Sequence, residues 1–145
     1  MPRGAVDSNT HVFPDPQKFP FWSGRAYTPP VATADDLLAL QKALHMDHVV
    51  IVTPSVYGTD NSATLDGIKQ LGPERARGVA VIDEKTSAAD VDAMHKGGIR
   101  GIRGILETGV FDTAVAAKKL DAAVQQVRGA HGIFRSMRDY RSSIR

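Results

Sequence analysis

The stretch His48-Val49-Val50-Ile51-Val52-Thr53 decides the fold, because it is a short apolar run, rich in β-branched residues, that ends at a polar side chain. β-Branched residues favour strands, and a run without polar alternation is typical of a strand that is buried on both faces of a parallel sheet. Gly78-Val79-Ala80-Val81-Ile82 has the same character. Together the two runs predict an α/β protein built on a parallel sheet.

Two further runs, residues 5–13 and 99–106, flank the central pair and bring the expected strands to four. Thr33 with Asp36, and Ser87 with Asp90, have the spacing of capping boxes and predict two helix starts. Apolar residues then recur every three or four positions, which predicts one buried face on each helix. These sets are Leu37, Leu40 and Leu44; Leu65, Ile68 and Leu71; Val91 and Met94; and Ala116, Leu120, Val124 and Val127 in a helix from about Asp112. The order is that of four βα units.

Composition narrows the classes of function. The chain has 145 residues, of which 42% are hydrophobic, and no cysteine, so we expect one packed domain without disulfides or thiolate metal ligands. It shows neither a membrane-spanning apolar run nor a secretory signal, which predicts a cytoplasmic protein with no membrane partner. The net charge of the whole chain is +2, and residues 132–145 alone carry a net charge of +3. The remainder is nearly neutral, so no nucleic-acid partner is expected.

Polar residues at the end of the first strand are the first candidates for chemistry. Asp7, Asn9 and His11 alternate along it, and a period of two sends them to one side. Buried polar groups without partners cost about 1 to 3 kcal/mol each, so these groups bind one another, water, a metal or a substrate. A hydrogen-bonded structural histidine and a ligand site both remain open. Residues 14–30, a long aromatic and proline-rich loop, are equally consistent with a substrate lid and with irregular surface packing.

A family resemblance joins these observations. Val6–Phe13 resembles the first-strand His-x-His motif of the amidohydrolase superfamily, and residues 26–30 and 53–61 strengthen the likeness. The chain is similar to the lactone-hydrolysing branch that includes 2-pyrone-4,6-dicarboxylate lactonase, over about residues 5 to 131. The resemblance implies a (β/α)8 barrel, of which residues 1–131 supply the four βα units of the N-terminal half. Residues 132–145 are expected to form a basic, irregular tail.

The same resemblance implies the site. His11 matches the second histidine of the motif, whereas Asn9 stands in place of the first, and an amide oxygen is a weak zinc ligand. The branch implies no required cofactor; a divalent metal such as zinc, held by His11, is the alternative. His11 and Asn9 are assigned to catalysis. The residues assigned to substrate binding are Tyr27, Ser55, Tyr57 and Arg103, with Arg103 clamping a carboxylate. Arg100, three residues earlier, is expected at the surface.

The implied substrate is a small anionic lactone or carboxylate, and the implied reaction is attack of water on the lactone carbonyl. The general base would come from an eighth strand that the sequence lacks, and loss of such a base costs about 10² to 10⁴ in rate. We therefore expect a hydrolase-like fragment that is inactive alone, and whether the chain is an enzyme stays open. One alternative is an active enzyme made of two half-barrels that associate through exposed sheet edges. The other is a small-molecule-binding α/β module without catalysis.

The end of the chain changes character after His131. Residues 132–145 show no strand alternation and contain four arginines. With one permitted choice of codons, the neighbouring reading frame encodes a strand-like Trp-His-Phe-Gln run, as the family pattern has at this place. The hypothesis is an out-of-frame or truncated tail, and a native basic tail is the alternative. The DNA sequence across codons 128 to 135 tests it.

Overall fold

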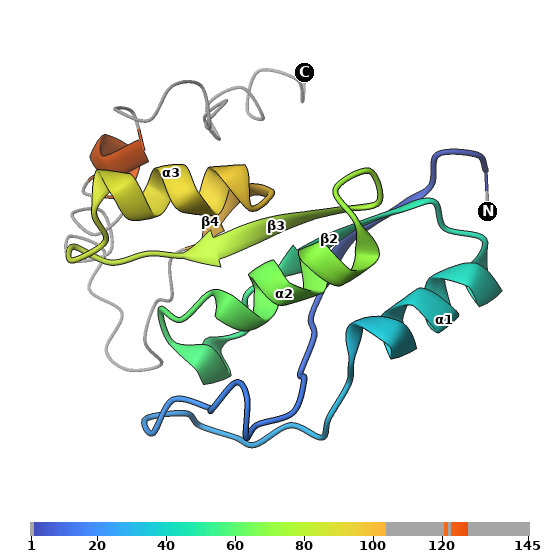
Figure 1. Ribbon diagram of the computed structural model, residues 1–145, viewed down its shortest axis with the longest axis horizontal. Coiled ribbons are helices and arrows are strands. Elements are labelled where there is room, and N and C mark those ends of the chain that lie inside the picture. Colours follow the sequence, from blue (N-terminus) through green and yellow to red (C-terminus); the bar gives the residue numbers. More distant parts are fainter. Residues whose placement is uncertain (1, 104–120, 122, 128–145) are drawn as a thin grey trace, which may run out of the picture.

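The computed structural model describes residues 2–103, 121 and 123–127 (Figure 1). The elements alternate as predicted: β1 (Val6–Thr10), α1 (Ala34–Leu44), β2 (His48–Val52), the 3-10 turn η1 (Ser55–Tyr57), α2 (Ser62–Leu71), β3 (Ala76–Val81), α3 (Ala88–Lys96) and β4 (Ile99–Arg103). Most of the predicted fourth helix and the whole basic tail lie outside the described residues. Within the described part, no helix combines the length and the apolar character needed to cross a membrane.

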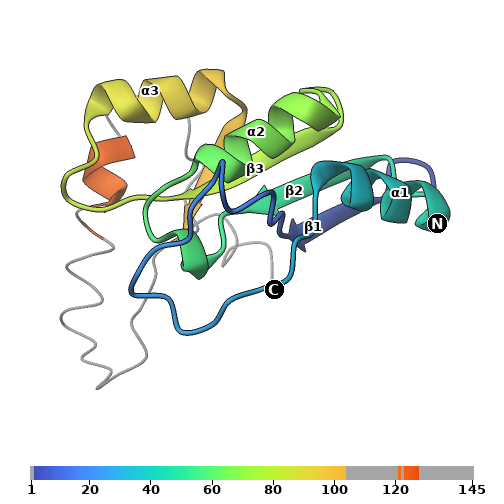
Figure 2. The same cartoon turned by 60° about the horizontal axis from the view of Figure 1, so that its bottom comes forward.

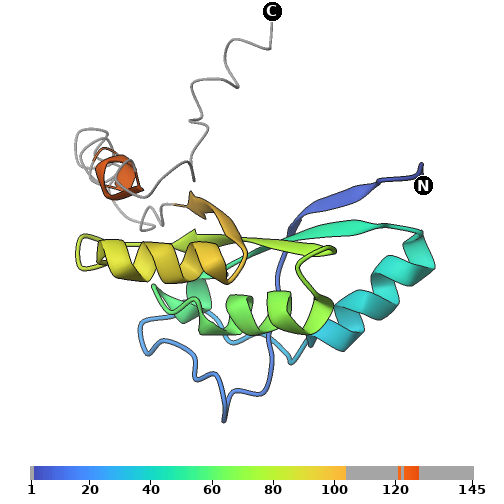
Figure 3. The same cartoon turned by 45° about the horizontal axis from the view of Figure 1, so that its top comes forward.

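The four strands form one parallel sheet in the order β1-β2-β3-β4, which confirms the parallel α/β prediction. Figure 3 shows α1, α2 and α3 along one face of this sheet. The long connection between β1 and α1, blue in Figure 2, lies at the end of the sheet to which the strands point. Side chains at the carboxyl ends of the strands and this loop therefore share one end of the molecule.

The core lies between the sheet and the three helices. Val49 and Ile51 of β2 and Ala76 and Ala80 of β3 are 0 to 1% exposed, as expected for strands covered by helices. The helical and strand side chains that complete this cluster include Leu37, Ile68, Val91, Met94 and Ile99.

Both predicted capping boxes are present. The Thr33 hydroxyl accepts a hydrogen bond from the Asp36 N–H at 3.2 Å, and the Asp36 carboxylate accepts from the Thr33 N–H at 2.8 Å. Ser87 and Asp90 repeat the arrangement at 3.1 and 2.9 Å. These hydrogen bonds lower the pKa of both aspartates below the ordinary value of 3.8, because they favour the charged carboxylate.

The prediction that one apolar face of α1 is buried along its whole length is wrong, because the burial of its leucines ends after the first turn of the helix. Leu37 is buried, but Leu40 and Leu44 are 51% and 41% exposed, and the buried residues of the helix are Ala34, Leu37 and Gln41. The helix packs against α2 and the sheet, which cover one side of it only. The leucine stripe that the spacing predicted therefore turns partly to solvent.

The predicted unbroken row of Asp7, Asn9 and His11 is also wrong, because β1 contains an extra residue. Asp7 lies opposite Val49 and Thr10 opposite Ile51, so three steps along β1 face two steps along β2. Such a bulge reverses the alternation of side chains. Asp7 shares the register position of the helix-facing Val49, and its carboxylate accepts a hydrogen bond from the Asn9 N–H at 3.4 Å.

Candidate functional site

His11 is fixed at the carboxyl end of β2. Its Nδ1 lies 2.7 Å from the carbonyl oxygen of Val52. A carbonyl oxygen only accepts, so Nδ1 donates in this contact, and in the neutral form of the ring the lone pair lies on Nε2. The ring is half-buried and lies 6.0 Å from that of Phe13, centroid to centroid. Nε2 is therefore the nitrogen that can accept a proton or orient a water molecule.

Arg103 reaches the next carbonyl of the same chain segment. It lies opposite Val81 in the register, and its guanidinium donates to the carbonyl oxygen of Thr53 at 3.4 Å. Val52 and Thr53 are consecutive, so His11 and Arg103 each contact a backbone carbonyl at the carboxyl end of β2. Among the residues that the structure describes, Arg103 has no ion-pair partner.

Arg100 lies elsewhere, as predicted. It occupies a bulge in β4, between the pairs that Ile99 and Gly101 make with β3, and is exposed. Its guanidinium donates to the carbonyl oxygen of His95 at 2.7 Å, in the last turn of α3. A cation at the carboxyl end of a helix is a common stabilising arrangement. Arg100 therefore serves as a matched control for Arg103.

A buried polar network holds the carboxyl end of β2 in place. The Thr53 hydroxyl is hydrogen-bonded to Asn61 at 2.9 Å and to Thr64 at 2.8 Å. The Asn61 amide also binds both backbone groups of Val81, each at 2.8 Å. The network therefore ties β2, α2 and β3 together directly beneath the carbonyl that Arg103 contacts. This network was not predicted from the sequence, although a threonine at the end of a strand followed by an asparagine at the start of a helix was a signal for it.

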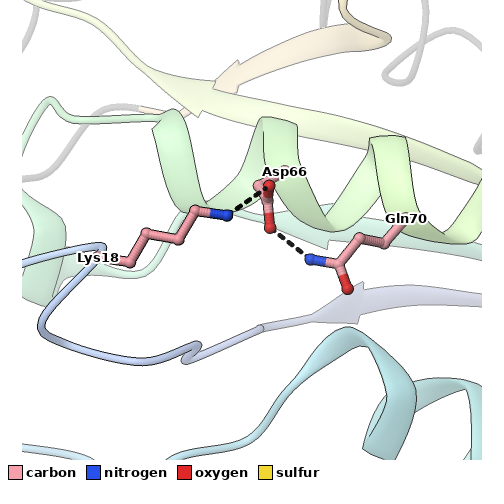
Figure 4. A network of polar contacts seen from close by, with 3 residues as sticks. All are labelled: Lys18, Asp66 and Gln70. Carbon is pink, nitrogen blue, oxygen red and sulfur yellow. Dashed lines mark hydrogen bonds and ion pairs between the residues drawn. The ribbon is translucent and has the colours of Figure 1, made fainter.

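The loop after β1 is anchored to the sheet at its base. Phe13 and Ala32 form an antiparallel bridge that closes the loop. Lys18 pairs with Asp66 of α2 at 3.4 Å, and Asp66 also accepts a hydrogen bond from Gln70 (Figure 4). A surface ion pair of this kind contributes about 0 to 1 kcal/mol.

Aromatic side chains form the second anchor of the loop. Phe19 is buried, and the ring of Phe21 lies 5.3 Å from that of Tyr57 in η1. The Trp22 N–H donates to the carbonyl oxygen of Val56 at 2.8 Å. The first half of the loop is thus packed surface structure, whereas Trp22 and Tyr27 are exposed by 50% and 49%.

The predicted substrate contacts do not all reach one place. Tyr57 is 3% exposed, and its buried hydroxyl has no hydrogen-bond partner among the described residues. Burial, with a smaller contribution from the charge of Asp60, raises its pKa to about 12. Ser55 is half-buried at the start of η1, and Asn9 is exposed on β1. The geometry therefore places His11 and Arg103 at the carboxyl end of β2 and gives the Tyr57 hydroxyl no access to a ligand.

The donor set does not fit zinc. Within the described residues there is no group of three His, Cys, Asp or Glu side chains that could hold a metal ion. His11 is accompanied by Asn9 where a second imidazole would be needed, and amide oxygens bind zinc weakly. A metal held by His11 therefore finds no support in the side chains around it.

Two hollows in the described part of the chain lie away from this pair. One, of about 560 Å³, lies between the starts of α2 and α3 and is lined by Asp60, Asp83 and Lys85 among others. The other, of about 290 Å³, lies beside Gln41 and Arg75. Neither is lined by His11 or Arg103.

A parallel sheet in the sequential strand order β1-β2-β3-β4, with its helices along one face, is typical of barrel-forming α/β proteins, in which ligands bind at the carboxyl end of the strands. A family model described as amidohydrolase matches residues 6–125. The chain belongs to the amidohydrolase family, as the sequence resemblance predicted.

Several relatives are lactone hydrolases. The chain is 40% identical over 103 residues to a 2-pyrone-4,6-dicarboxylate hydrolase of Comamonas testosteroni, covering 71% of this chain and 33% of the relative. It is 32% identical over 121 residues to a 4-sulfomuconolactone hydrolase of Rhizobium radiobacter, covering 77% and 40%. The chain is thus related to lactone hydrolases.

Solved structures give the same result for the fold. An Agrobacterium tumefaciens protein in its apo form matches with a TM-score of 0.74 and 29% identity, over 90% of this chain and 46% of that one. A probable 2-pyrone-4,6-dicarboxylic acid hydrolase from Acinetobacter baumannii, with citric acid bound, matches with a TM-score of 0.68 and 27% identity, over 85% and 46%. The chain spans 33% to 46% of the length of these relatives, and its four βα units form half of a barrel.

Proposed function

We propose that the carboxyl end of this sheet binds a small anionic lactone through its carboxylate. The observation that carries the proposal is that His11 and Arg103 each contact a backbone carbonyl at the carboxyl end of β2, those of Val52 and Thr53. A guanidinium offers a planar fork of N–H donors that matches a carboxylate. The names of the lactone-hydrolase relatives supply the class of ligand.

The tautomer of His11 restricts its part in such a site. A neutral ring with the proton on Nδ1 cannot polarise a lactone carbonyl, because Nε2 has no hydrogen to donate. It can accept a hydrogen bond from the water that attacks the carbonyl carbon. The amide N–H₂ of Asn9, two residues before His11, could donate to the carbonyl oxygen. These two roles divide the chemistry between His11 and Asn9.

Hydrolysis demands more than these two groups. Water adds to the carbonyl carbon, the ring C–O bond breaks, and the departing oxygen takes a proton to give an open-chain hydroxy acid. A base and an acid must handle those protons, each contributing about 10² to 10⁴ in rate. Because the chain spans less than half of the related hydrolases, we propose that a single copy binds the lactone and turns it over slowly or not at all.

Calorimetric titration with 2-pyrone-4,6-dicarboxylate and with a muconolactone tests the proposal. Arg103→Ala should weaken binding about tenfold or more, because a charge-assisted contact is lost. Arg100→Ala, the matched control at the surface, should leave binding unchanged. Equal affinities for the two variants would rule out the Arg103 clamp, and hydrolysis at enzymatic rates by monomeric chain would rule out the binding-only assignment.

A further inference from the structure

We infer that β1 and α1 form an interface for a second copy of this chain, arranged so that β4 of each copy lies beside β1 of the other and two half-sheets close into one barrel. The inference stands on packing and register, and it does not require that the mouth binds a lactone.

Exposed apolar side chains mark the interface. Every large hydrophobic residue recorded as exposed within the described part of the chain belongs to residues 6–44, which contain β1, its loop and α1. Val6, Leu40 and Leu44 lie in β1 and α1 and mark the interface, whereas Trp22, Tyr27 and Val31 belong to the loop that connects these two elements. Leu40 and Leu44 continue a helical stripe whose first member, Leu37, is buried in the core. When an apolar stripe on a helix extends from the core to the surface, its exposed part indicates a surface that another helix covers.

The sheet has two unpaired edges in the described residues. β1 pairs only with β2, and β4 pairs only with β3. Open edges present unpaired N–H and C=O groups, which favour association with another strand. A two-fold axis parallel to the strands keeps strand direction, so β4 would meet β1 of the second copy in the parallel sense used throughout the sheet.

The register fits closure by two copies. Val6 lies opposite His48, while Gly101 lies opposite Val79, which in turn lies opposite Val52. Val52 is four residues beyond His48 in β2, so the positions of Val6 and Gly101 differ by four residues when both are projected onto β2. An eight-stranded βα barrel has a shear of about eight residues, so each of two symmetric halves must contribute about four. Closure therefore sets Gly101 of one copy opposite Val6 of the other.

The side chains at that pair are complementary. Val6 precedes Asp7, which faces the helices, so Val6 points to the opposite face and is 49% exposed. Gly101 has no side chain, and a Cβ there would meet Cγ2 of Val79 at 3.0 Å. Val6 of one copy would cover Gly101 of the other. A larger side chain at the position of Gly101 would leave too little space for this valine.

A second copy is the occupant that the strand count favours. The described part of the chain supplies four parallel strands, so two copies would supply the eight strands of a complete barrel. A two-fold axis along the barrel also brings both carboxyl ends to one end. The closed mouth would then hold two copies each of His11 and Arg103, and the site of a single chain is incomplete without its partner.

Engineered cysteines test this arrangement, because the chain has no native cysteine. The double variant Val6→Cys/Gly101→Cys should form a covalent dimer on mild oxidation, since aligned neighbours in a sheet lie within disulfide reach. Either single variant should stay uncross-linked, because the symmetry sets equivalent strands on opposite sides of the barrel. Mixing the two single variants should restore the cross-link. Val31→Cys/Gly101→Cys, with a valine that is 58% exposed in the loop, is the control and should not cross-link.

Sedimentation of the unmodified chain keeps the test independent of the variants' folding. It should give a particle of twice the 15.6 kDa chain mass, and dilution should dissociate it. A monomer at all concentrations would overturn the inference. Cross-linking of Val6→Cys alone would instead show antiparallel edge pairing, and equal cross-linking of the Val31 control would show random collision. Both outcomes also exclude the proposed barrel.

Discussion

The centre of the sheet and its β1 edge show how much packing each βα unit receives from its neighbours. In the centre, Ile51 and Ala80 are fully buried and Ile68 of α2 is 2% exposed. At the edge, α1 has α2 on one side only, and Leu40 is 51% exposed. Both regions have the same kind of sequence, with apolar strands and periodic helices. The difference lies in the number of neighbours, which local sequence does not encode.

Polar residues follow the same division. Asn61, in the centre, is 9% exposed and makes hydrogen bonds through both atoms of its amide. Asn9, on β1, is exposed, and no side-chain hydrogen bond is recorded for it within the described residues. One asparagine is part of the framework, whereas the side chain of the other is exposed to solvent. Mutation of Asn61 should therefore lower the free energy of unfolding strongly, whereas mutation of Asn9 should hardly change it.

The largest expected effect is that of Asn61→Ala. The substitution leaves both backbone groups of Val81 without their partner, and each unsatisfied buried group costs about 1 to 3 kcal/mol, for a total of about 4 kcal/mol. Asn9→Ala, the matched control, should change the free energy of unfolding by less than about 0.5 kcal/mol. Urea denaturation measures both. Similar losses for the two variants would show that the edge is as tightly packed as the centre.

A second pair of variants compares the two helices. Ile68→Ala in α2 should cost about 3 kcal/mol, within the range for large-to-small changes in a core. Leu40→Ala in α1 should cost less than about 1 kcal/mol in the isolated chain, because half of that side chain is already in water. Chemical denaturation of dilute samples gives both values. A concentration-dependent loss for Leu40→Ala alone would indicate that this leucine lies in a contact between copies, whereas a large loss independent of concentration would contradict its exposure.

Local signals in the sequence predicted the elements well. The β-branched run at 48–53 became β2, and the pairs Thr33–Asp36 and Ser87–Asp90 became capping boxes, because strand and cap preferences depend on residues close in sequence. Where side chains point was harder to predict. Because of the bulge in β1, Asp7 does not lie on the same face as Asn9 and His11, and no residue type in Asp7–His11 predicts an extra residue relative to β2.

The site was predicted in part for a related reason. The assignment of Arg103 and Arg100 to different surroundings agrees with the structure, because the register of β4 separates them. The exposure of Tyr57 could not be read from its position after a strand, since its burial depends on Phe21, which is distant in sequence. Contacts between distant segments decide burial, and a single sequence records them only indirectly.

The smallest expected effect concerns the helix caps, where the two regions should behave alike. Thr33→Ala at α1 and Ser87→Ala at α3 each remove a cap hydrogen bond, and each should lower Tm by about 2 to 4 °C. Both caps are local and exposed, so the number of neighbouring elements should not matter. Thermal melts followed by circular dichroism give the two shifts. A much larger shift at α3 than at α1 would mean that tertiary packing, rather than the cap itself, sets the cost.

The stability that the two capping boxes contribute to α1 and α3 should depend on pH in the same direction. Hydrogen bonds from Thr33 and Ser87 lower the pKa of Asp36 and Asp90 below 3.8. Because the folded chain holds the charged form more firmly than the unfolded chain, this stabilisation is complete above pH 3.8 and is lost as the pH falls through the lowered value. The Tm differences between the wild type and Asp36→Asn or Asp90→Asn should therefore be constant near neutral pH and shrink together in acid. If only one of the two differences shrinks, the reciprocal hydrogen bonds at the other helix do not persist in solution.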